Sequence, residues 1–297
     1  MSTTTTTTTH RRLIVELCHG GADARTLRAA AEFARLLGLD LHGLFIEDEA
    51  LLHLADLPFA REIRLPTHQW HPVEAHRITA ELEHAAAEAQ RLLRQAATTL
   101  GVRNMFEVRR GDPAETIATI SSAGDIIVIA APTGTGARLA PGFAAMHAAA
   151  HASAASVLLL PEAEAPRHGP VVAVLTERDD PALPSAAVLA AAAREDLLLL
   201  LIPDGEMAAE RDATDRAATL GVPRNRVAVR KLGGLQPEDI LHALGGTSER
   251  LLVMTSDASA AAAGAGAARI AAARGVPVLL VQGFRWREQE TPAPGEE

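Results

Sequence analysis

The sequence predicts an α/β protein made of two tandem units, each a parallel β-sheet with helices on both faces. Three observations carry this prediction: the second half of the chain repeats the first, short apolar runs alternate with amphipathic segments, and each apolar run is continuous. Continuous apolar strands separated by helices are typical of parallel sheets covered on both faces. A chain of 297 residues also has about the length of two domains.

The internal repeat keeps a nearly constant offset. The run TLGV at 99–102 returns at 219–222, an offset of 120, and SVLLL at 156–160 matches PVLLV at 277–281, an offset of 121. Nearer the N-terminus residues 39–48 match 195–204, an offset of 156, so the first copy is longer by about 35 residues. Two unequal copies of one long unit indicate a duplicated domain rather than a short-period solenoid.

Five strands are expected in the first copy, at short segments rich in apolar residues: 13–18, 41–46, 102–108, 125–130 and 156–160. Helices are expected at 23–37 after a glycine turn and at 73–100, where Ala and Leu recur at helical spacing. Another helix begins at Asp112 and Pro113, because aspartate caps a helix and proline fits its first turn. Residues 48–73 are expected to form an irregular insertion.

The second copy follows the same order. Strands are expected at 170–176, 197–202, 225–231, 250–255 and 277–281, with helices at 181–193, 206–220, 236–245 and 258–274. These elements define a first domain at 11–160, a polar linker at 161–169 and a shorter second domain at 170–282. Residues 1–10 and 283–297 are polar or charged and are expected to be disordered tails.

Composition excludes several classes of function. The net charge of -9 disfavours a nucleic-acid partner, since phosphate binding needs clustered cations. Lys231 is the only lysine, so neither a P-loop nor Schiff-base chemistry has a suitable lysine. Cys18 is the only cysteine, which excludes an internal disulfide framework and a CxxC metal site. Without a signal peptide or a spanning apolar stretch, the protein is expected to be cytoplasmic, with no membrane insertion.

The order and spacing of these segments resemble the universal stress protein family in its tandem form. The features that carry the resemblance are LIV at 13–15 before a glycine turn, GDPAE at 111–115, DIIV at 125–128 and the closing strands VLLL at 157–160 and PVLLV at 277–281. The resemblance implies two flavodoxin-like (Rossmann-like) five-stranded domains that pair through their last strands, with a homodimer as a further option. It also implies a stress-response protein that is not an enzyme and acts through partner binding or weak nucleotide binding.

Family members that bind ATP carry an acidic residue at the end of the first strand, which meets adenine. They also carry a Gly-x2-Gly-x9-Gly-Ser/Thr segment whose amides hold phosphate. In this sequence the acidic position falls on Cys18 in the first copy and on Thr176 in the second. The corresponding loop positions are Thr133, Gly134, Thr135, Gly136 and Gly142 in the first copy, and Gly264 and Gly266 in the second.

Both phosphate segments depart from the family pattern. Phe143 and Ala265 stand where Ser/Thr is expected, and Asp257 would repel phosphate in the second copy. We therefore expect no cofactor, or weak binding of ATP or AMP in the first domain. The alternative is an ATP-binding switch with slow hydrolysis that uses the 131–142 loop.

The 48–73 insertion has no counterpart in the second copy. Leu51, Leu54 and Leu57 recur every third residue and, with Leu52 and Phe59, are expected to line a short helix that ends at Pro58. Together with Trp70 these residues are the candidate surface for an unidentified protein partner. A lid over the first-domain cleft and local packing against the following helix are the alternatives.

Other polar residues suggest chemistry only weakly. His147 and His151 share one helix face and could bind a metal ion, as could His68, His71 and His76, but helical and loop histidines are usually unliganded. Cys18 could be a redox-sensing thiol if His19 lowers its pKa, or an inert buried thiol. We find no Gly-x-Ser-x-Gly elbow and no acid/base pair. The sequence therefore assigns no metal ligand and no catalytic residue.

Overall fold

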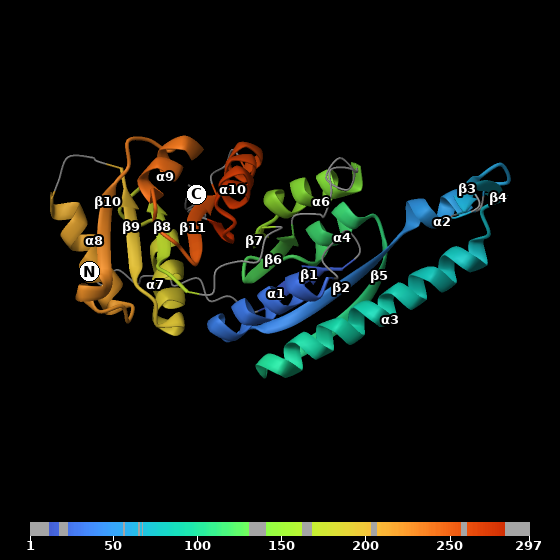
Figure 1. The fold of residues 1–297 in the computed structure, drawn as a ribbon, viewed down its shortest axis with the longest axis horizontal. Helices are drawn as coiled ribbons and strands as arrows, with labels where there is room; N and C mark the ends of the chain where they lie inside the picture. Colours follow the sequence, from blue (N-terminus) through green and yellow to red (C-terminus); the bar gives the residue numbers. More distant parts are fainter. Residues whose placement is uncertain are drawn as a thin grey trace, which may run out of the picture.

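A computed structural model describes residues 12–17, 23–55, 57–64, 66, 68–130, 141–161, 168–202, 207–256 and 260–282. Ten strands form one sheet with helices on both faces (Figure 1). Within these residues no helix combines the length and the apolar character needed to cross a bilayer. The expected tails and residues 162–167 of the expected linker lie outside the described residues.

The first half of the sheet holds five parallel strands in the order β5-β2-β1-β6-β7. The strands are β1 (Arg12–Glu16), β2 (Asp40–Asp48), β5 (Asn104–Gly111), β6 (Asp125–Ala130) and β7 (Ser156–Leu160). The helices that connect them are α1 (Ala24–Leu37), α3 (Ala75–Leu100), α4 (Pro113–Ile120) and α6 (Pro141–Ala152).

The second half repeats this order as β10-β9-β8-β11-β12, again parallel throughout. Its strands are β8 (Val171–Leu175), β9 (Leu197–Leu201), β10 (Val227–Lys231), β11 (Leu251–Ser256) and β12 (Val278–Gln282). Its helices are α7 (Ala182–Ala193), α8 (Met207–Thr219), the 3-10 turn η1 (Arg224–Arg226), α9 (Pro237–Leu244) and α10 (Ala260–Arg274).

The two halves confirm the predicted pair of five-stranded parallel sheets, and the strand order in each, 3-2-1-4-5 along the chain, is that of the first five strands of a Rossmann fold. The halves meet where β7 and β12 run antiparallel, with Val157 opposite Leu280. This one antiparallel contact joins the two sheets into a single ten-stranded sheet.

Local signals explain where the helices begin and end. Asp23 caps α1 by accepting a hydrogen bond from the Thr26 amide at 2.6 Å. Asp112 caps α4 through the Glu115 amide at 2.9 Å, and Pro113 is the first helical residue, which confirms the predicted start. Gly101 ends α3 with φ of 67°, a left-handed conformation that suits glycine.

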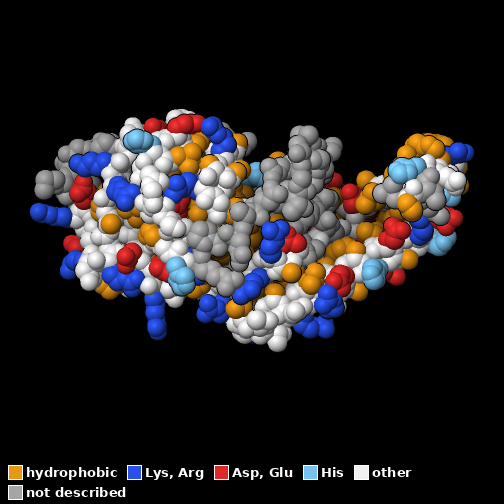
Figure 2. Space-filling model, in the orientation of Figure 1, with side chains coloured by type: hydrophobic (Ala, Val, Ile, Leu, Met, Phe, Trp, Pro, Cys, Tyr) orange, Lys and Arg blue, Asp and Glu red, His pale blue; other side chains and the backbone are white. Residues whose placement is uncertain are grey.

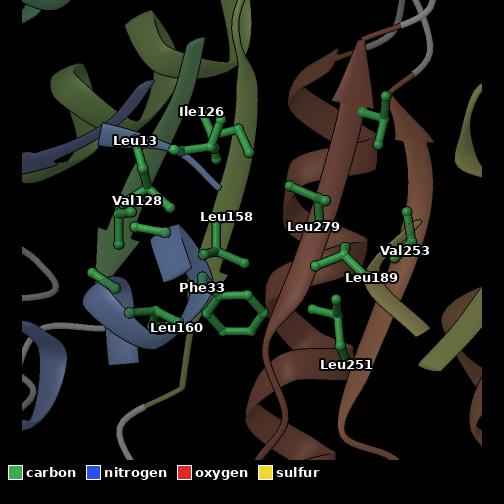
Figure 3. Packing of buried hydrophobic residues seen from close by; sticks show 14 of the residues in the cluster. Leu13, Phe33, Ile126, Val128, Leu158, Leu160, Leu189, Leu251, Val253 and Leu279 are labelled. Atoms are coloured by element: carbon green, nitrogen blue, oxygen red, sulfur yellow. The ribbon is translucent and has the colours of Figure 1, made fainter. Parts of the chain in front are cut away.

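Two buried apolar clusters lie on opposite faces of the sheet, and each contains residues of both halves. On one face Phe33 of α1 and Leu158 of β7 lie close to Leu189 of α7 and Leu279 of β12 (Figure 3). Because the core crosses the seam, each half buries apolar surface against the other.

Between β2 and α3 the chain forms a projecting arm, defined here as residues 49–74. It contains α2 (Glu49–Ala55) and the antiparallel hairpin of β3 (Arg61–Arg64) and β4 (Gln69–Pro72). The expected irregular insertion is therefore partly ordered, and the expected helix ends at Ala55 rather than at Pro58. Figure 1 shows the arm standing away from the body at the far end of α3.

The length of α3 explains why the arm projects. Its 26 residues extend for about 39 Å, and three of its four buried residues, Ala89, Leu93 and Ala97, lie in its second half. That half packs closely on β2 because Gly43 has no side chain: a Cβ there would lie 2.5 Å from Leu93 Cδ2. The first half of α3 therefore extends beyond the sheet and supports the arm.

Candidate functional site

The strand order places a ligand crevice in each half. In open parallel sheets ligands bind at the carboxyl ends of the strands, where the chain order reverses. This position lies between β1 and β6 in the first half and between β8 and β11 in the second. The structure describes both strand ends of the second crevice but not residues 257–259, and in the first crevice it describes neither Cys18 nor residues 131–140.

In the second crevice the carboxylate of Asp180 binds both strand ends. Its Oδ2 accepts hydrogen bonds from Thr176 N at 2.8 Å and Thr176 Oγ1 at 2.9 Å. Its Oδ1 accepts one from Ala182 N at 2.9 Å and another from Thr255 Oγ1. Asp180 is 1% exposed. These hydroxyl and amide donors are therefore already bound to a buried carboxylate and are not available to a phosphate.

The other residues predicted to bind phosphate in the second half lie inside a helix. Gly264 and Gly266 fall beyond the first four residues of α10, and only those first four amides lack an intrahelical acceptor. A Cβ at Gly266 would lie 3.4 Å from Pro237 Cγ, so this glycine lets α10 approach α9 closely. Both glycines lie in the helix predicted at 258–274.

The strand registers support the predicted equivalence of the two strand ends. Leu13 pairs with Leu41 and Ile126 as Val171 pairs with Leu197 and Leu251, and all six residues face the same apolar cluster. Counting from Leu13 and Val171, the equivalent of Cys18 is Thr176. The second half therefore has a threonine rather than an acidic residue at this position.

Most residues predicted to bind a nucleotide in the first crevice are not tested by the structure. Cys18 and the loop residues Thr133, Gly134, Thr135 and Gly136 lie outside the described residues. Gly142 is the second residue of α6, so its amide is among those without an intrahelical acceptor, as a phosphate contact requires.

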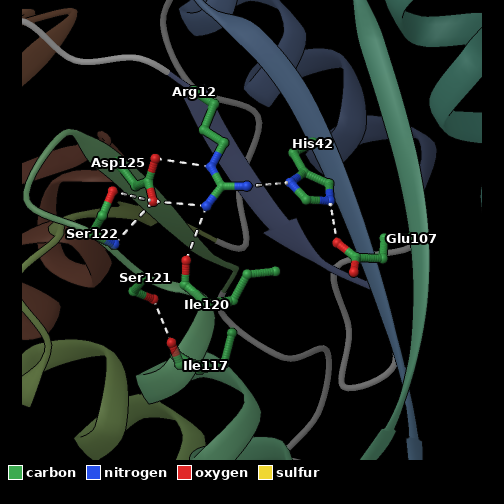
Figure 4. A network of polar contacts seen from close by, with 8 residues as sticks. All are labelled: Arg12, His42, Glu107, Ile117, Ile120, Ser121, Ser122 and Asp125. Carbon is green, nitrogen blue, oxygen red and sulfur yellow. Dashed lines mark hydrogen bonds and ion pairs between the residues drawn. The ribbon is translucent and has the colours of Figure 1, made fainter.

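A polar network that the sequence analysis missed lies near the amino ends of the first-half strands, opposite the crevice (Figure 4). Arg12 Nε donates to Asp125 Oδ1 at 2.9 Å, and Arg12 Nη2 donates to Asp125 Oδ2 at 3.1 Å. Arg12 Nη2 also donates to the Ile120 carbonyl, and Ser122 donates twice to Asp125. Asp125 is 1% exposed, so this is a buried bidentate ion pair between β1 and β6.

His42 on β2 extends the network to β5. Its Nδ1 lies 3.1 Å from Arg12 Nη1 and must accept, because a guanidinium only donates. Its Nε2 therefore carries the proton, and lies 3.2 Å from Glu107 Oε2. Burial lowers the pKa of His42, and Arg12 lowers it further. The network joins four strands and points to a structural role at this end of the sheet.

His147 and His151 lie together on α6, as their spacing predicted. Their Nε2 atoms are 3.3 Å apart and their ring centroids 4.4 Å apart. No group of three or more potential metal ligands occurs in the part of the chain that the structure describes, including His68, His71 and His76 of the arm region. Burial, with a smaller effect of His147, lowers the pKa of His151 to about 4.

This histidine pair predicts acid sensitivity. The unfolded chain takes up a proton on His151 near pH 6.5, but the folded chain does so only near pH 4. The free energy of unfolding should therefore fall as pH drops from 6.5 to 4, by up to about 3 kcal/mol from this group. Urea unfolding at several pH values measures this fall. The free energy of unfolding should fall less between pH 6.5 and 4 for His151→Leu than for the wild type. A matched change at the exposed His84 of α3 should leave this pH dependence unchanged.

The arm is the most apolar exposed region of the described chain. Its exposed side chains, with exposures from 41% to 74%, are Leu51, Leu54, Leu57, Phe59, Ile63 and Trp70. Leu52 is half-buried and Ala55 is buried, and α2 packs against α3. The packing of α2 on α3 therefore buries only some of the apolar side chains of the arm. Figure 2 shows orange side chains at the tip of the arm.

Comparison with known proteins supports the fold. No family model matches the sequence, and no curated protein matches it. A universal stress protein from Archaeoglobus fulgidus DSM 4304 matches 93% of this chain and 97% of its own, with a TM-score of 0.67 and 16% identity. A functionally unknown protein from Pseudomonas aeruginosa PAO1 matches 94% of this chain and 95% of its own, with a TM-score of 0.56 and 16% identity. The chain therefore has the universal stress protein fold in tandem form.

Proposed function

We propose that this chain is a universal-stress-type protein that acts in the stress response without catalysis, by binding a protein partner through its arm. The observation that carries the proposal is the set of large apolar side chains exposed on residues 49–74. The second half has the same strand order without such an arm, so the fold does not require it. Clustered exposed apolar and aromatic residues mark interaction sites, and Trp and Phe are suited to anchor a partner.

Replacing residues 50–70 with a short Gly/Ser linker tests whether the arm is dispensable for folding. The arm packs on itself and on the projecting half of α3, so the far-UV circular dichroism and the urea midpoint should change little. Loss of folding would instead support the local-packing alternative.

A photo-crosslinking amino acid at Phe59 tests binding itself. In cells it should give a defined crosslinked product, whereas the same group at Val188, an exposed apolar position of the second half, should not. An absence of any product at Phe59, or equal products at both positions, would contradict a partner site on the arm.

Weak nucleotide binding in the first half is the second candidate function. It is favoured by the Gly142 amide, which lies in the first turn of α6 and has no intrahelical acceptor, and the second crevice is disfavoured by the Asp180 carboxylate. Binding should thus be limited to one nucleotide per chain. A more specific version of this proposal is that the bound nucleotide is ATP and that the 131–142 loop hydrolyses it slowly.

Calorimetric titration with ATP and AMP tests this candidate. Any binding should be abolished by Gly134→Val or Gly136→Val, because a side chain there would keep the backbone away from phosphate. Gly233→Val is a matched control at a glycine of the second half with open space around it. Tight binding that survives both loop changes would show that the nucleotide lies elsewhere.

A further inference from the structure

The histidine pair of α6 lies where the two halves of the chain meet. α6 packs against α10 of the second half (Figure 1). The carbonyl of His151 accepts a hydrogen bond from Gln282 Nε2, at the end of β12, at 3.4 Å. His151 is 3% exposed, whereas His147 is only partly buried. The pair is therefore anchored on its inner side and reached by solvent on the side of His147.

The fold does not require histidines at these positions. α10 is the equivalent of α6, because each of these helices lies between the fourth and fifth strands of its half. With the repeat offset of 121, the equivalents of His147 and His151 are Ala268 and Ala272. A buried imidazole costs free energy when one of its nitrogens is left without a partner. His151 Nδ1 has no hydrogen-bond partner among the residues that the structure describes, so packing alone does not explain this histidine.

The geometry of the pair matches that of two ligands of one metal ion. Imidazole nitrogens bind Zn²⁺ at about 2.0–2.1 Å, so two of them at a tetrahedral angle lie about 3.4 Å apart. The Nε2 atoms of His147 and His151 are 3.3 Å apart, closer than the ring centroids at 4.4 Å, so the two rings converge toward their Nε2 atoms. A hydrogen bond between the rings is the alternative, but N–H donors usually lie about 2.7–3.2 Å from their acceptors.

We propose that His147 and His151 bind one divalent transition-metal ion, Zn²⁺, Cu²⁺ or Ni²⁺, through their Nε2 atoms. Imidazole is a preferred ligand of these ions, and two histidines four residues apart on a helix are suited to hold one of them. No third potential ligand joins the pair in the described part of the chain, so water fills the other positions from the side of His147. An ion with open positions suits reversible binding rather than a permanent structural role.

Calorimetric titration of the full, chelator-treated chain with ZnCl₂ tests the proposal. His147→Ala and His151→Ala should each lower the affinity of one site per chain by at least about tenfold, and the double change should abolish it. Alanine occupies both equivalent positions of the second half, so these variants should fold, and circular dichroism checks this. His151→Gln keeps a polar side chain and should weaken the site as well.

The matched control is His76→Ala combined with His84→Ala. It also removes two histidines from one helix, but these are exposed and lie eight residues apart on α3, too far to share an ion. The control should keep the site at wild-type affinity. If the control loses this site, the ion lies elsewhere and the proposal is wrong.

Electron paramagnetic resonance of the chain loaded with one equivalent of Cu²⁺ identifies the ligands. The wild type should show coupling to two imidazole nitrogens, and His147→Ala and His151→Ala should each show coupling to fewer. If the wild type binds neither Zn²⁺ nor Cu²⁺, or binds them no more tightly than the double variant, the 3.3 Å contact is only a hydrogen bond between the rings. Either result would overturn the proposal.

Discussion

Asp125→Ala is expected to lower the free energy of unfolding by about 3 kcal/mol. The carboxylate is 1% exposed and accepts two hydrogen bonds from Arg12 and two from Ser122. Its removal leaves the half-buried Arg12 guanidinium with a histidine as its remaining side-chain partner. Urea unfolding at neutral pH measures the loss.

Two comparisons identify the unpaired arginine as the cause. The double change Arg12→Met with Asp125→Ala should be less destabilised than Asp125→Ala alone, because no charge is then left behind. Glu88→Ala removes a close but exposed ion pair with Arg91 on α3 and should change stability hardly at all. Equal losses for Asp125→Ala and Glu88→Ala would contradict the burial argument.

The same network adds a second acid-sensitive step. Burial raises the pKa of Asp125, but the hydrogen bonds from Arg12 and Ser122 outweigh burial and hold it below its usual value. This contribution is therefore present at neutral pH and is lost as pH falls through the folded pKa, below about 3.8. The loss of stability from protonation of Asp125 therefore occurs at lower pH than the loss expected from His151.

Strands and helix starts were predictable because their signals are local. The run DIIVIA at 125–130 is apolar at every residue after Asp125, and it forms β6 at those residues. Asp112 and Pro113 specify the start of α4 within two residues. The β3–β4 hairpin was missed because REIR and QWHP show no clear alternation and their neighbouring prolines resemble a loop.

The polar networks were not predicted because their members are far apart in sequence. Arg12 and Asp125 are separated by 113 residues, and Asp180 and Thr255 by 75. One signal was available: Arg12 and Asp125 each begin a strand that is otherwise mostly apolar, and neighbouring parallel strands bring such residues side by side. Asp180 gave no comparable signal, since it lies in a short acidic loop that reads as exposed.

Asp180→Ala is expected to destabilise the chain by about 3 kcal/mol, because four donors lose one buried acceptor. Two of these donors are the amides of Thr176 and Ala182, which cannot turn away from the site as a side chain can. Thr255→Val removes a single donor and should cost only about 1 kcal/mol. Asp179→Ala is the matched control, since that neighbouring side chain is 88% exposed.

A small anion should partly replace the missing carboxylate. Formate or acetate should raise the urea midpoint of Asp180→Ala but not that of the wild type, since only the variant has vacant donors between β8 and β11. Equal effects on both proteins would show a general salt effect instead. If Asp180→Ala costs no more than Asp179→Ala, the carboxylate does not hold the second crevice closed. The limit of one nucleotide per chain would then lose its physical basis.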